Sequence, residues 1–289
     1  MASKLERIGT LSVADHDRDV TGMRYVYPVV SRRAGGVSIG VNLNPNNACN
    51  WRCVYCQVPG LTFGKGPPVD LALLERELEE TLEAVVHGDF LERHAPAGAR
   101  RLNDIALSGN GEPTTCPDFG ATLEVIARAL DRHRLRGRIK LVLITNGSML
   151  NKPEIQANLR RMAELGGEVW FKLDSATGPG ALAINNCHAS PDEHFEKLRA
   201  AAAACPTWLQ TCWFRRLGQP PSPLEQAAYL ATLERVRREA VPVQGVHLYT
   251  LARPSLQPEA GELAPLEAEW LNAFAARIQA LGLPVTVSA

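Results

Sequence analysis

The sequence predicts an α/β fold with a parallel sheet inside and helices packed outside it. Short, β-branched apolar segments alternate with longer segments in which apolar residues recur at helical spacing. Residues that start and end helices separate the two kinds of segment. Because a parallel return to the same sheet needs a crossover connection, this alternation favours a doubly wound sheet or a (β/α) barrel.

Each strand is assigned from a short apolar run bounded by turn residues. Residues 1–36 form a polar lead-in with one short strand near 24–30, and we expect the core domain to span residues 37–289. The core strands are predicted at 37–43, 104–108, 139–144, 169–174, 208–214 and 243–251, with a seventh at 285–287.

Each helix is assigned from apolar periodicity behind a capping residue. Asp70 predicts the start of a helix over 71–85, and Gly137 predicts the end of a helix over 118–136. Capping boxes at Ser190-Pro191-Asp192-Glu193 and Ser222-Pro223-Leu224-Glu225 begin two more helices. Further helices are expected from 153 to the glycine pair 166–167 and over 265–281.

Composition and charge argue against several classes of protein. The 31 Lys+Arg and 31 Asp+Glu residues cancel, so overall charge gives no support to a polynucleotide partner or an anionic membrane. No stretch approaches the roughly 20 apolar residues of a membrane span, and the N-terminus lacks the apolar core of a signal peptide. We therefore expect a cytoplasmic protein with no membrane partner. Dinucleotide and phosphate-loop glycine motifs are missing too, which disfavours nicotinamide and nucleotide-triphosphate chemistry.

Three cysteines, Cys49, Cys53 and Cys56, lie within eight residues with the spacing C-x3-C-x2-C. They are predicted on the loop after the first core strand. Three thiolates so close together cannot all pair as disulfides, but they converge on one metal centre if the backbone loops around it. We interpret them as ligands of an iron–sulfur cluster that has one iron without a cysteine, open to a substrate.

The other four cysteines weigh against a structural zinc site. Such a site normally has four protein ligands, commonly two C-x2-C pairs, and no second pair occurs here. The dispersed cysteines, which we expect to be buried core thiols, are Cys116, Cys187, Cys205 and Cys212. We assign no role to Cys187-His188, because adjacent residues in a strand point to opposite faces.

Polar residues follow several predicted strands, where ligands bind in parallel α/β folds. This edge should collect the cysteine loop, Gly109–Thr114, Asn146-Gly147-Ser148, Asp174-Ser175 and 249–253.

These motifs resemble those of the radical S-adenosylmethionine (SAM) enzymes. The three-cysteine motif has an aromatic residue, Tyr55, before its third cysteine, and a Gly-Glu-Pro element follows the second core strand. Ser31-Arg32-Arg33 and 38–42 add similarity to the wyosine-synthase-related Fe–S oxidoreductase group. The resemblance implies a partial (β/α)6 barrel, SAM as cofactor and a [4Fe-4S] cluster on Cys49, Cys53 and Cys56.

The resemblance also implies roles for single residues. Tyr55 would pack near the adenine of SAM, and the Gly-Glu-Pro turn would offer acceptors to its amino group, with glycines that permit close approach. Lys172 and Asp174 are candidates for the ribose and carboxylate. The expected cofactor-binding residues are Tyr55, Gly109, Gly111, Glu112, Pro113, Lys172 and Asp174; Arg32, Arg33, Tyr249 and Arg253 are further candidates for cofactor or substrate contact.

The activity implied is that of a radical SAM enzyme. Its single cluster would cleave SAM reductively, and the 5′-deoxyadenosyl radical would abstract a substrate hydrogen. The substrate stays open among a small metabolite, a peptide and a nucleoside or tRNA, and we expect an external one-electron reductant such as flavodoxin or ferredoxin. Three alternatives remain. The first is tRNA guanosine modification of wyosine-synthase type, whose enzymes use further N-terminal cysteines that residues 1–48 lack. The others are a non-enzymatic iron–sulfur electron carrier and a zinc-binding structural module.

Overall fold

The computed structural model of the chain describes residue 5 and residues 8–12, 21–31 and 35–289. The strands are β1 Val26–Ser31, β2 Gly36–Val41, β3 Ala48–Cys49, β4 Thr62–Phe63, β5 Leu102–Leu107, β6 Lys140–Thr145, β7 Gly167–Lys172, β8 Thr207–Cys212, β9 Phe214–Arg216, β10 Val243–Tyr249, β11 Leu263–Pro265 and β12 Val285–Ser288. The α-helices are α1 Leu71–Leu82, α2 Phe90–His94, α3 Phe119–Arg132, α4 Pro153–Glu164, α5 Gly178–Asn185, α6 Pro191–Ala204, α7 Pro223–Arg238 and α8 Ala268–Gln279. A π-helical turn, Glu83–His87, continues α1.

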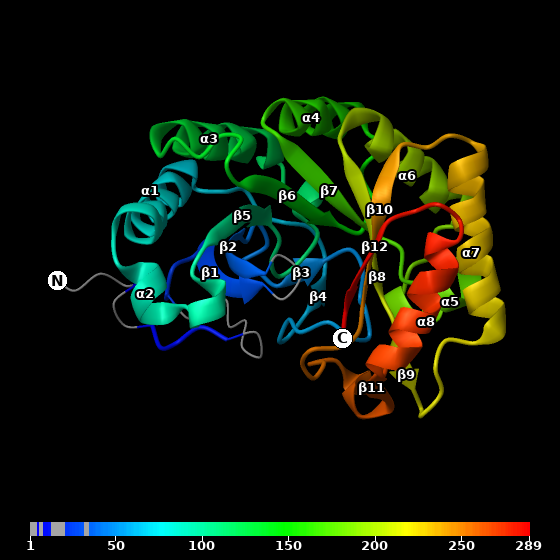
Figure 1. The fold of residues 1–289 in the computed structure, drawn as a ribbon. Coiled ribbons are helices and arrows are strands. Elements are labelled where there is room, and N and C mark those ends of the chain that lie inside the picture. Colours follow the sequence, from blue (N-terminus) through cyan, green and yellow to red (C-terminus); the bar gives the residue numbers. More distant parts are fainter. Residues whose placement is uncertain (1–4, 6–7, 13–20, 32–34) are drawn as a thin grey trace.

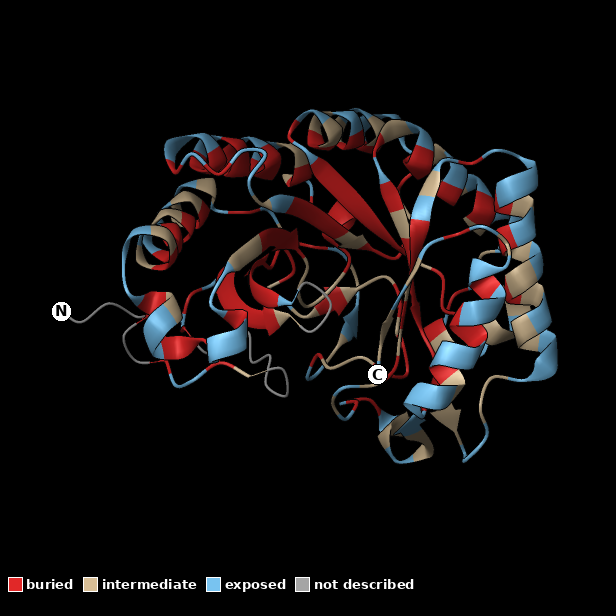
Figure 2. Ribbon diagram, in the orientation of Figure 1, coloured by how far each residue is buried: buried red, intermediate tan, exposed pale blue. Residues whose placement is uncertain are grey.

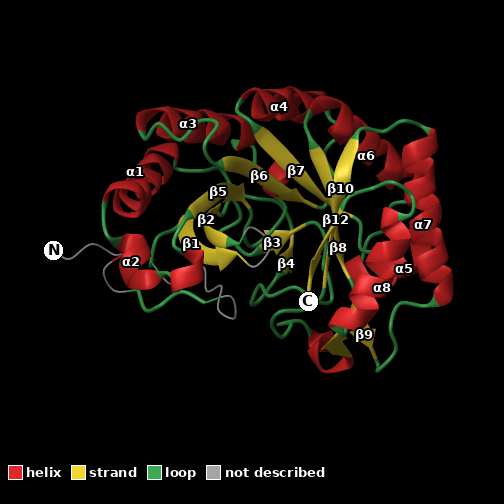
Figure 3. Ribbon diagram, viewed as in Figure 1, coloured by secondary structure: helices red, strands yellow, loops and turns green. Residues whose placement is uncertain are grey.

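The main sheet has eight strands in the order β1-β2-β5-β6-β7-β8-β10-β12. β1 runs antiparallel to β2, and every other neighbouring pair is parallel. Figures 1 and 3 show the helices in an arc around the outside of the curled sheet, from α1 through α3 and α4 to α7 and α8. The expected α/β class, with parallel strands inside and helices outside a partial barrel, is confirmed.

Burial follows the periodicity of the sequence. Each residue of β2 is buried, and the inward face of α3 buries Phe119, Leu123, Ile126 and Leu130 at helical spacing. Figure 2 shows the same division, with buried residues along the strands and exposed residues on the outer helix surfaces. Burial of each such apolar side chain stabilises the fold by about 1.5–3 kcal/mol. This packing fixes the position of the sheet edge that carries the site.

Helix α3 ends earlier than Gly137 predicts. Its last residue is Arg132, and Arg134 takes a left-handed conformation with φ +55°. The Leu135 N–H then donates to Leu130 O at 2.7 Å, which closes the helix end without glycine, while the buried Leu135 side chain anchors the turn.

Two boundaries near the C-terminal half also differ from the prediction. The strand expected over 208–214 divides into β8 and β9, and β9 pairs with β11 instead of the main sheet. Because Leu263–Pro265 belongs to β11, the last helix begins at Ala268, after the predicted start at 265. The helix α5 was not predicted.

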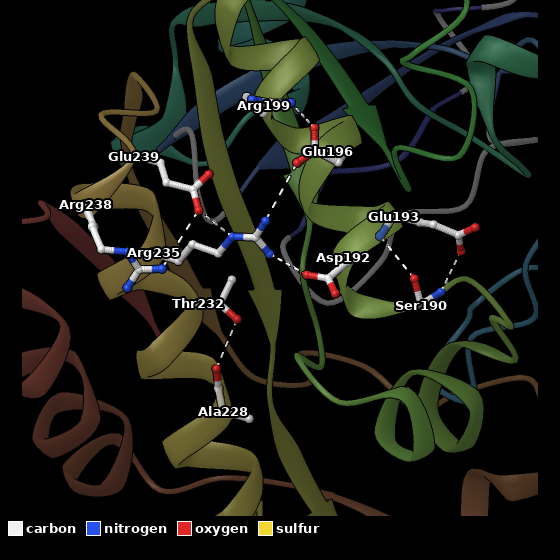
Figure 4. Close-up of polar contacts among 10 residues, drawn as sticks. All are labelled: Ser190, Asp192, Glu193, Glu196, Arg199, Ala228, Thr232, Arg235, Arg238 and Glu239. Carbon is white, nitrogen blue, oxygen red and sulfur yellow. Dashed lines mark hydrogen bonds and ion pairs between the residues drawn. The ribbon is translucent and has the colours of Figure 1, made fainter.

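The two predicted capping boxes have different outcomes. Ser190 and Glu193 form the complete reciprocal pair at the start of α6 (Figure 4). At α7, Ser222 accepts from the Glu225 N–H, but the Glu225 carboxylate accepts from Ala176 N and Thr177 Oγ1. The predicted helix start and the Ser222 cap are therefore confirmed, but the reciprocal half of the box does not form, because the Glu225 carboxylate bonds to the loop after β7 instead.

Helices α6 and α7 are joined at their surfaces by Arg235. Its guanidinium contacts Asp192 at 2.6 Å and Glu239 at 2.8 Å (Figure 4). It also lies 3.8 Å from the centre of the Phe195 ring. The aromatic contact shields part of the charge, so this Arg acts through packing as well as charge.

The lead-in contributes β1, which confirms the strand expected near 24–30 and covers the edge of β2. Arg32 and Arg33 lie outside the described residues. Among the described helices, none is both long and apolar enough to cross a membrane.

Candidate functional site

The three motif cysteines lie on the loop that leads from the carboxyl end of β2 toward α1. Cys53 is buried, while Cys49 and Cys56 are partly exposed. All three line one cavity of about 280 Å³, and all belong to one apolar cluster with Trp51 and Tyr55. The fold thus places all three cysteines of the motif around one cavity.

Helix α5 and the segment after β10 hold this loop. The Arg52 and Val54 N–H groups donate to Asn185 O at 3.2 Å and to Ile184 O at 2.8 Å. From the other side, the Ser255 hydroxyl donates to Val54 O at 2.7 Å. The loop is therefore fixed by main-chain bonds to distant parts of the chain.

Two further contacts reinforce the second attachment. Arg52 forms a two-bond ion pair with Glu259 at 2.7 and 2.8 Å. The Leu256 N–H donates to Cys56 O at 2.9 Å, so main-chain pairing extends to the third motif cysteine.

Glu112 links the turn after β5 to the end of β6. Its Oε1 accepts from Thr114 Oγ1 at 2.6 Å and from Thr145 Oγ1 at 2.7 Å, and its Oε2 accepts from Asn146 N at 2.6 Å. Burial raises the pKa of this carboxyl, although the hydrogen bonds oppose that shift. Since both oxygens are bonded within the chain, the side chain acts here by positioning the turn.

The glycines of this turn allow the chain to contact itself. A Cβ on Gly111 would lie 2.1 Å from Ala48 O, in the cysteine loop. Gly109 has φ +145°, and a Cβ there would lie 2.4 Å from Asn42 Oδ1. The turn thus packs directly on the segment that leads into the cysteine motif, at the edge of the sheet where the sequence predicts both.

Tyr55, Lys172 and Asp174 come together beside Cys53. The Tyr55 hydroxyl donates to Asp174 Oδ2, and Lys172 Nζ donates to the Tyr55 oxygen at 2.9 Å. The Cys212 N–H donates to Asp174 Oδ1 at 2.9 Å, which ties the end of β7 to the end of β8. Three candidates from two separate parts of the sequence therefore form one largely buried network.

Burial controls the ionisation of the thiols. It raises the pKa of Cys49 to about 12 and that of Cys53 to about 11. Burial would by itself lower the pKa of Lys172, but interaction with Cys53 in its thiolate form and with the Asp174 carboxylate outweighs burial and raises that pKa. A metal bound here must displace thiol protons, and the Lys172 ammonium favours the resulting negative charge.

Asn185 is a site residue that the sequence reasoning missed. Its Nδ2 lies 3.2 Å from Cys53 Sγ and donates to Asp174 Oδ2 at 2.8 Å. It ends α5, whose start is capped by Thr177 and whose end is marked by Asn186 at φ +51°. Both capping residues are sequence signals that would have found this helix.

The cavity extends from the cysteines across the inner face of the sheet. Ser38 and Asp104 line it on the β2 and β5 side, and Trp170 and Gln210 line it on the β7 and β8 side. Gln210 Oε1 is buried and has no hydrogen-bond partner among the described residues. Such an orphaned acceptor on a cavity wall suits a ligand that brings a donor.

The structure also places the other residues that the sequence analysis singled out. Gly109, Gly111, Tyr249 and Arg253 line the cavity, and Arg253 Nε donates to Gln57 at 2.9 Å. The dispersed cysteines are all buried, as expected. Cys187 follows α5 in a loop, so the assumption of a strand at Cys187-His188 was wrong.

Comparison with known proteins gives one family. A sequence profile of the Radical SAM superfamily matches residues 43–231, more than half of the chain. The UPF0026 protein slr1464 of Synechocystis sp. is 29% identical over 150 residues, which cover 52% of this chain and 48% of that protein. The UPF0026 protein MJ1312 of Methanocaldococcus jannaschii is 27% identical over 164 residues, 56% of this chain and 43% of its own length.

A third relative is the GTPase Obg of Brachyspira hyodysenteriae, 28% identical over 132 residues. These residues cover 46% of this chain but 17% of that protein. The chain thus spans less than half the length of each of these curated relatives.

Solved structures share the fold at low sequence identity. SuiB of Streptococcus suis, bound to the precursor peptide SuiA, has a TM-score of 0.56 at 12% identity and covers 86% of this chain and 48% of its own. TYW1 with a lysine-pyruvate adduct has a TM-score of 0.54 at 13% identity, and the match covers 86% of this chain and 74% of that protein. A radical SAM methyltransferase from Sphaerobacter thermophilus has a TM-score of 0.52 at 15% identity. The match covers 88% of this chain and 66% of that protein.

The profile match includes the cysteine motif, the turn after β5 and the end of β7, which the fold places around one cavity. The half-barrel sheet agrees with the folds of the radical SAM enzymes among the solved structures. The chain belongs to the Radical SAM superfamily, whose enzymes use a [4Fe-4S] cluster and SAM.

Proposed function

We propose that Cys49, Cys53 and Cys56 hold a single [4Fe-4S] cluster and that the chain is a radical SAM enzyme. When bound, the cluster and SAM supply reductive cleavage of SAM and a 5′-deoxyadenosyl radical that abstracts a substrate hydrogen. The observation that carries the proposal is the opening of all three thiols onto one cavity. Thiolates are the ligands of such clusters, and three of them leave one iron for SAM.

The donor set and its surroundings fit this cofactor. Asn185 directs an amide donor at Cys53 Sγ, as is usual around cluster sulfurs, and no acidic side chain hydrogen-bonds to a motif thiol among the described contacts. Lys172 places a cation next to the thiols, which offsets the negative charge of three thiolates.

The surrounding residues have distinct tasks. Lys172 has three donors and uses one on Tyr55, so it can bind the SAM carboxylate with another. Main-chain oxygens of Gly109 and Gly111, which line the cavity, would offer acceptors to the SAM amino group, and the Glu112 side chain holds their turn in place. The predicted contact at Pro113 gains no support, because Pro113 is not among the lining residues and its oxygen accepts from the Cys116 N–H at 3.1 Å.

Tyr55 lines the cavity and would form its wall on the adenine side, whereas Asp174 is not among the lining residues and holds the Tyr55 hydroxyl in place. Buried aromatic residues such as Trp51 and Trp170 limit access of water to the cavity.

For the substrate and the reductant, we propose only the chemical class. The cavity and the balanced charge admit a small metabolite, a peptide, or a nucleoside or tRNA, and a one-electron donor such as flavodoxin or ferredoxin would act in the cytoplasm. The peptide of SuiB and the adduct of TYW1 belong to those proteins. Comparing metabolites and tRNA nucleosides from cells with and without the protein separates these classes.

The activity itself is tested without knowing the substrate. After anaerobic reconstitution, the chain is mixed with SAM and a strong reductant, and 5′-deoxyadenosine is measured by chromatography. We expect its formation to depend on both reductant and cluster. A cluster that is reduced without any 5′-deoxyadenosine identifies an electron carrier instead, and one zinc with neither iron nor sulfide identifies a structural module.

Replacing Asn185 should change the cluster potential. In Asn185→Ala the amide donor to Cys53 is lost, and donors to sulfur stabilise the more negative reduced cluster. A hydrogen bond worth about 1 kcal/mol corresponds to about 40 mV for one electron, so we expect the midpoint potential to fall by tens of millivolts. A redox titration followed by EPR measures it, with the exposed Asn151→Ala as control. An unchanged potential at full iron content contradicts the assigned contact.

A further inference from the structure

A second group of metal-ligating side chains lies outside the barrel, far in sequence from the cysteine motif. Glu83 and His87 are on the π-helical turn that continues α1, and His133 caps the end of α3. One ligand atom from each of the three lies within 4.8 Å of the others. None of the three lines the cavity described above.

The two imidazoles already have the separation that one metal ion requires. His87 Nε2 and His133 Nδ1 are 3.2 Å apart. Two nitrogens on one zinc ion, at bonds of about 2.0–2.1 Å and a tetrahedral angle of about 109°, lie about 3.3 Å apart. At this distance the nitrogens either share one proton or bind one metal.

The buried imidazole of His133 is also oriented by a carboxylate on the side of the ring away from His87. His133 Nε2 lies 2.9 Å from Glu79 Oε2, and it must carry the proton to donate to that carboxylate. In the neutral ring Nδ1 is then unprotonated and directs its lone pair toward His87. A carboxylate behind a histidine is the usual arrangement at zinc sites, and Arg132 contacts the other Glu79 oxygen at 2.5 Å.

The third ligand is adjustable and completes the set. The Glu83 side chain is exposed and lies four residues before His87, so it can rotate toward the two nitrogens without disturbing the core. Two imidazoles and a carboxylate suit a divalent zinc ion, with water as fourth ligand. π-Helical turns often occur where a helix is distorted to aim side chains at a ligand.

We propose that Glu83, His87 and His133 bind one zinc ion that joins the end of α1 to the end of α3. The two helices pack against each other on the outside of the sheet (Figure 1). Their ends lie on the side where β5 and β6 begin, opposite the strand ends that carry the cysteines. The ion therefore joins the two helix ends away from the chemistry of the cavity, and its water position sets it apart from a closed structural zinc site.

The test uses the full chain with its cluster loaded, so that zinc is not taken up by the motif cysteines. Zinc chloride is titrated calorimetrically, and we expect one site per chain with a Kd of about 1 μM or below. X-ray absorption at the zinc edge should show nitrogen and oxygen at about 2.0–2.1 Å and no sulfur at about 2.3 Å. Zinc should also raise the Tm of the chain by several degrees.

Variants make the assignment specific. His87→Gln combined with His133→Asn should weaken binding by at least about 100-fold, and Glu79→Gln by about 10–100-fold. The exposed His188→Gln is the matched control and should bind zinc as the wild type does. Because His87 is exposed, His87→Gln alone keeps the fold, which iron content and circular dichroism verify. Equal binding by the double variant, sulfur around the zinc, or no binding by the wild type overturns the proposal.

Discussion

Replacing Cys53 by alanine should abolish the formation of 5′-deoxyadenosine. Cys53 is the buried centre of the three-thiol set, and two thiols cannot hold a four-iron cluster against solvent. We expect iron to fall from about four atoms per chain to less than one. The rate of SAM cleavage should drop at least about 1000-fold, equivalent to about 4 kcal/mol of activation free energy.

Cys187→Ala is the matched control for this experiment. It removes a thiol that is buried in the same apolar cluster while all three motif cysteines remain. Iron content and product formation should stay close to those of the wild type. If both variants lose the cluster equally, the effect comes from damaged packing and the ligand assignment fails.

Asp174→Ala should lower stability more than any other single polar change at the site. The carboxylate accepts hydrogen bonds from Tyr55, Asn185 and the Cys212 N–H, all within the buried network. Each orphaned buried donor costs about 1–3 kcal/mol, and Lys172 loses a nearby negative charge. We expect the free energy of unfolding to fall by about 3–5 kcal/mol, as measured by urea titration under anaerobic conditions.

Two companion variants separate loss of the network from loss of a charge. Asp174→Asn keeps the shape and can still accept from the Cys212 N–H, so its loss of stability should be intermediate. The exposed Asp131→Ala should unfold like the wild type, because its partner Arg136 is exposed too. A stable Asp174→Ala protein with an intact cluster would mean that the network contributes little to the site.

Local patterns predicted most of the fold because each core strand is short, apolar and bounded by turn residues. The errors occurred where tertiary contacts outweighed local signals. Arg134 closes α3 in a left-handed conformation that glycine would normally supply, since Leu135 gains burial there. Glu225 leaves its capping role because Ala176 and Thr177 bring donors to it from another loop.

For the candidate site too, local patterns could be predicted from the sequence and tertiary contacts could not. The cysteine spacing is local, so it was readable from the sequence, and the strand-end rule placed Asp174 at the same edge, while the family resemblance pointed to Lys172. The partners of these residues were not readable, because hydrogen bonds such as Asn185 to Cys53 join segments more than a hundred residues apart. The bonded state of Glu112 also depends on β6, which no local pattern specifies.

The pairing of the cysteine loop with the last turn of α5 has a kinetic consequence. Because Arg52 and Val54 donate to main-chain oxygens of Asn185 and Ile184, the two segments form one cooperative unit. Iron approaches Cys53 from the cavity that all three thiols line, and the closed unit holds the cysteine loop in position behind it. Fraying of the last turn of α5 should therefore loosen the loop and speed the escape of iron, so the lifetime of the cluster should follow the stability of one short helix.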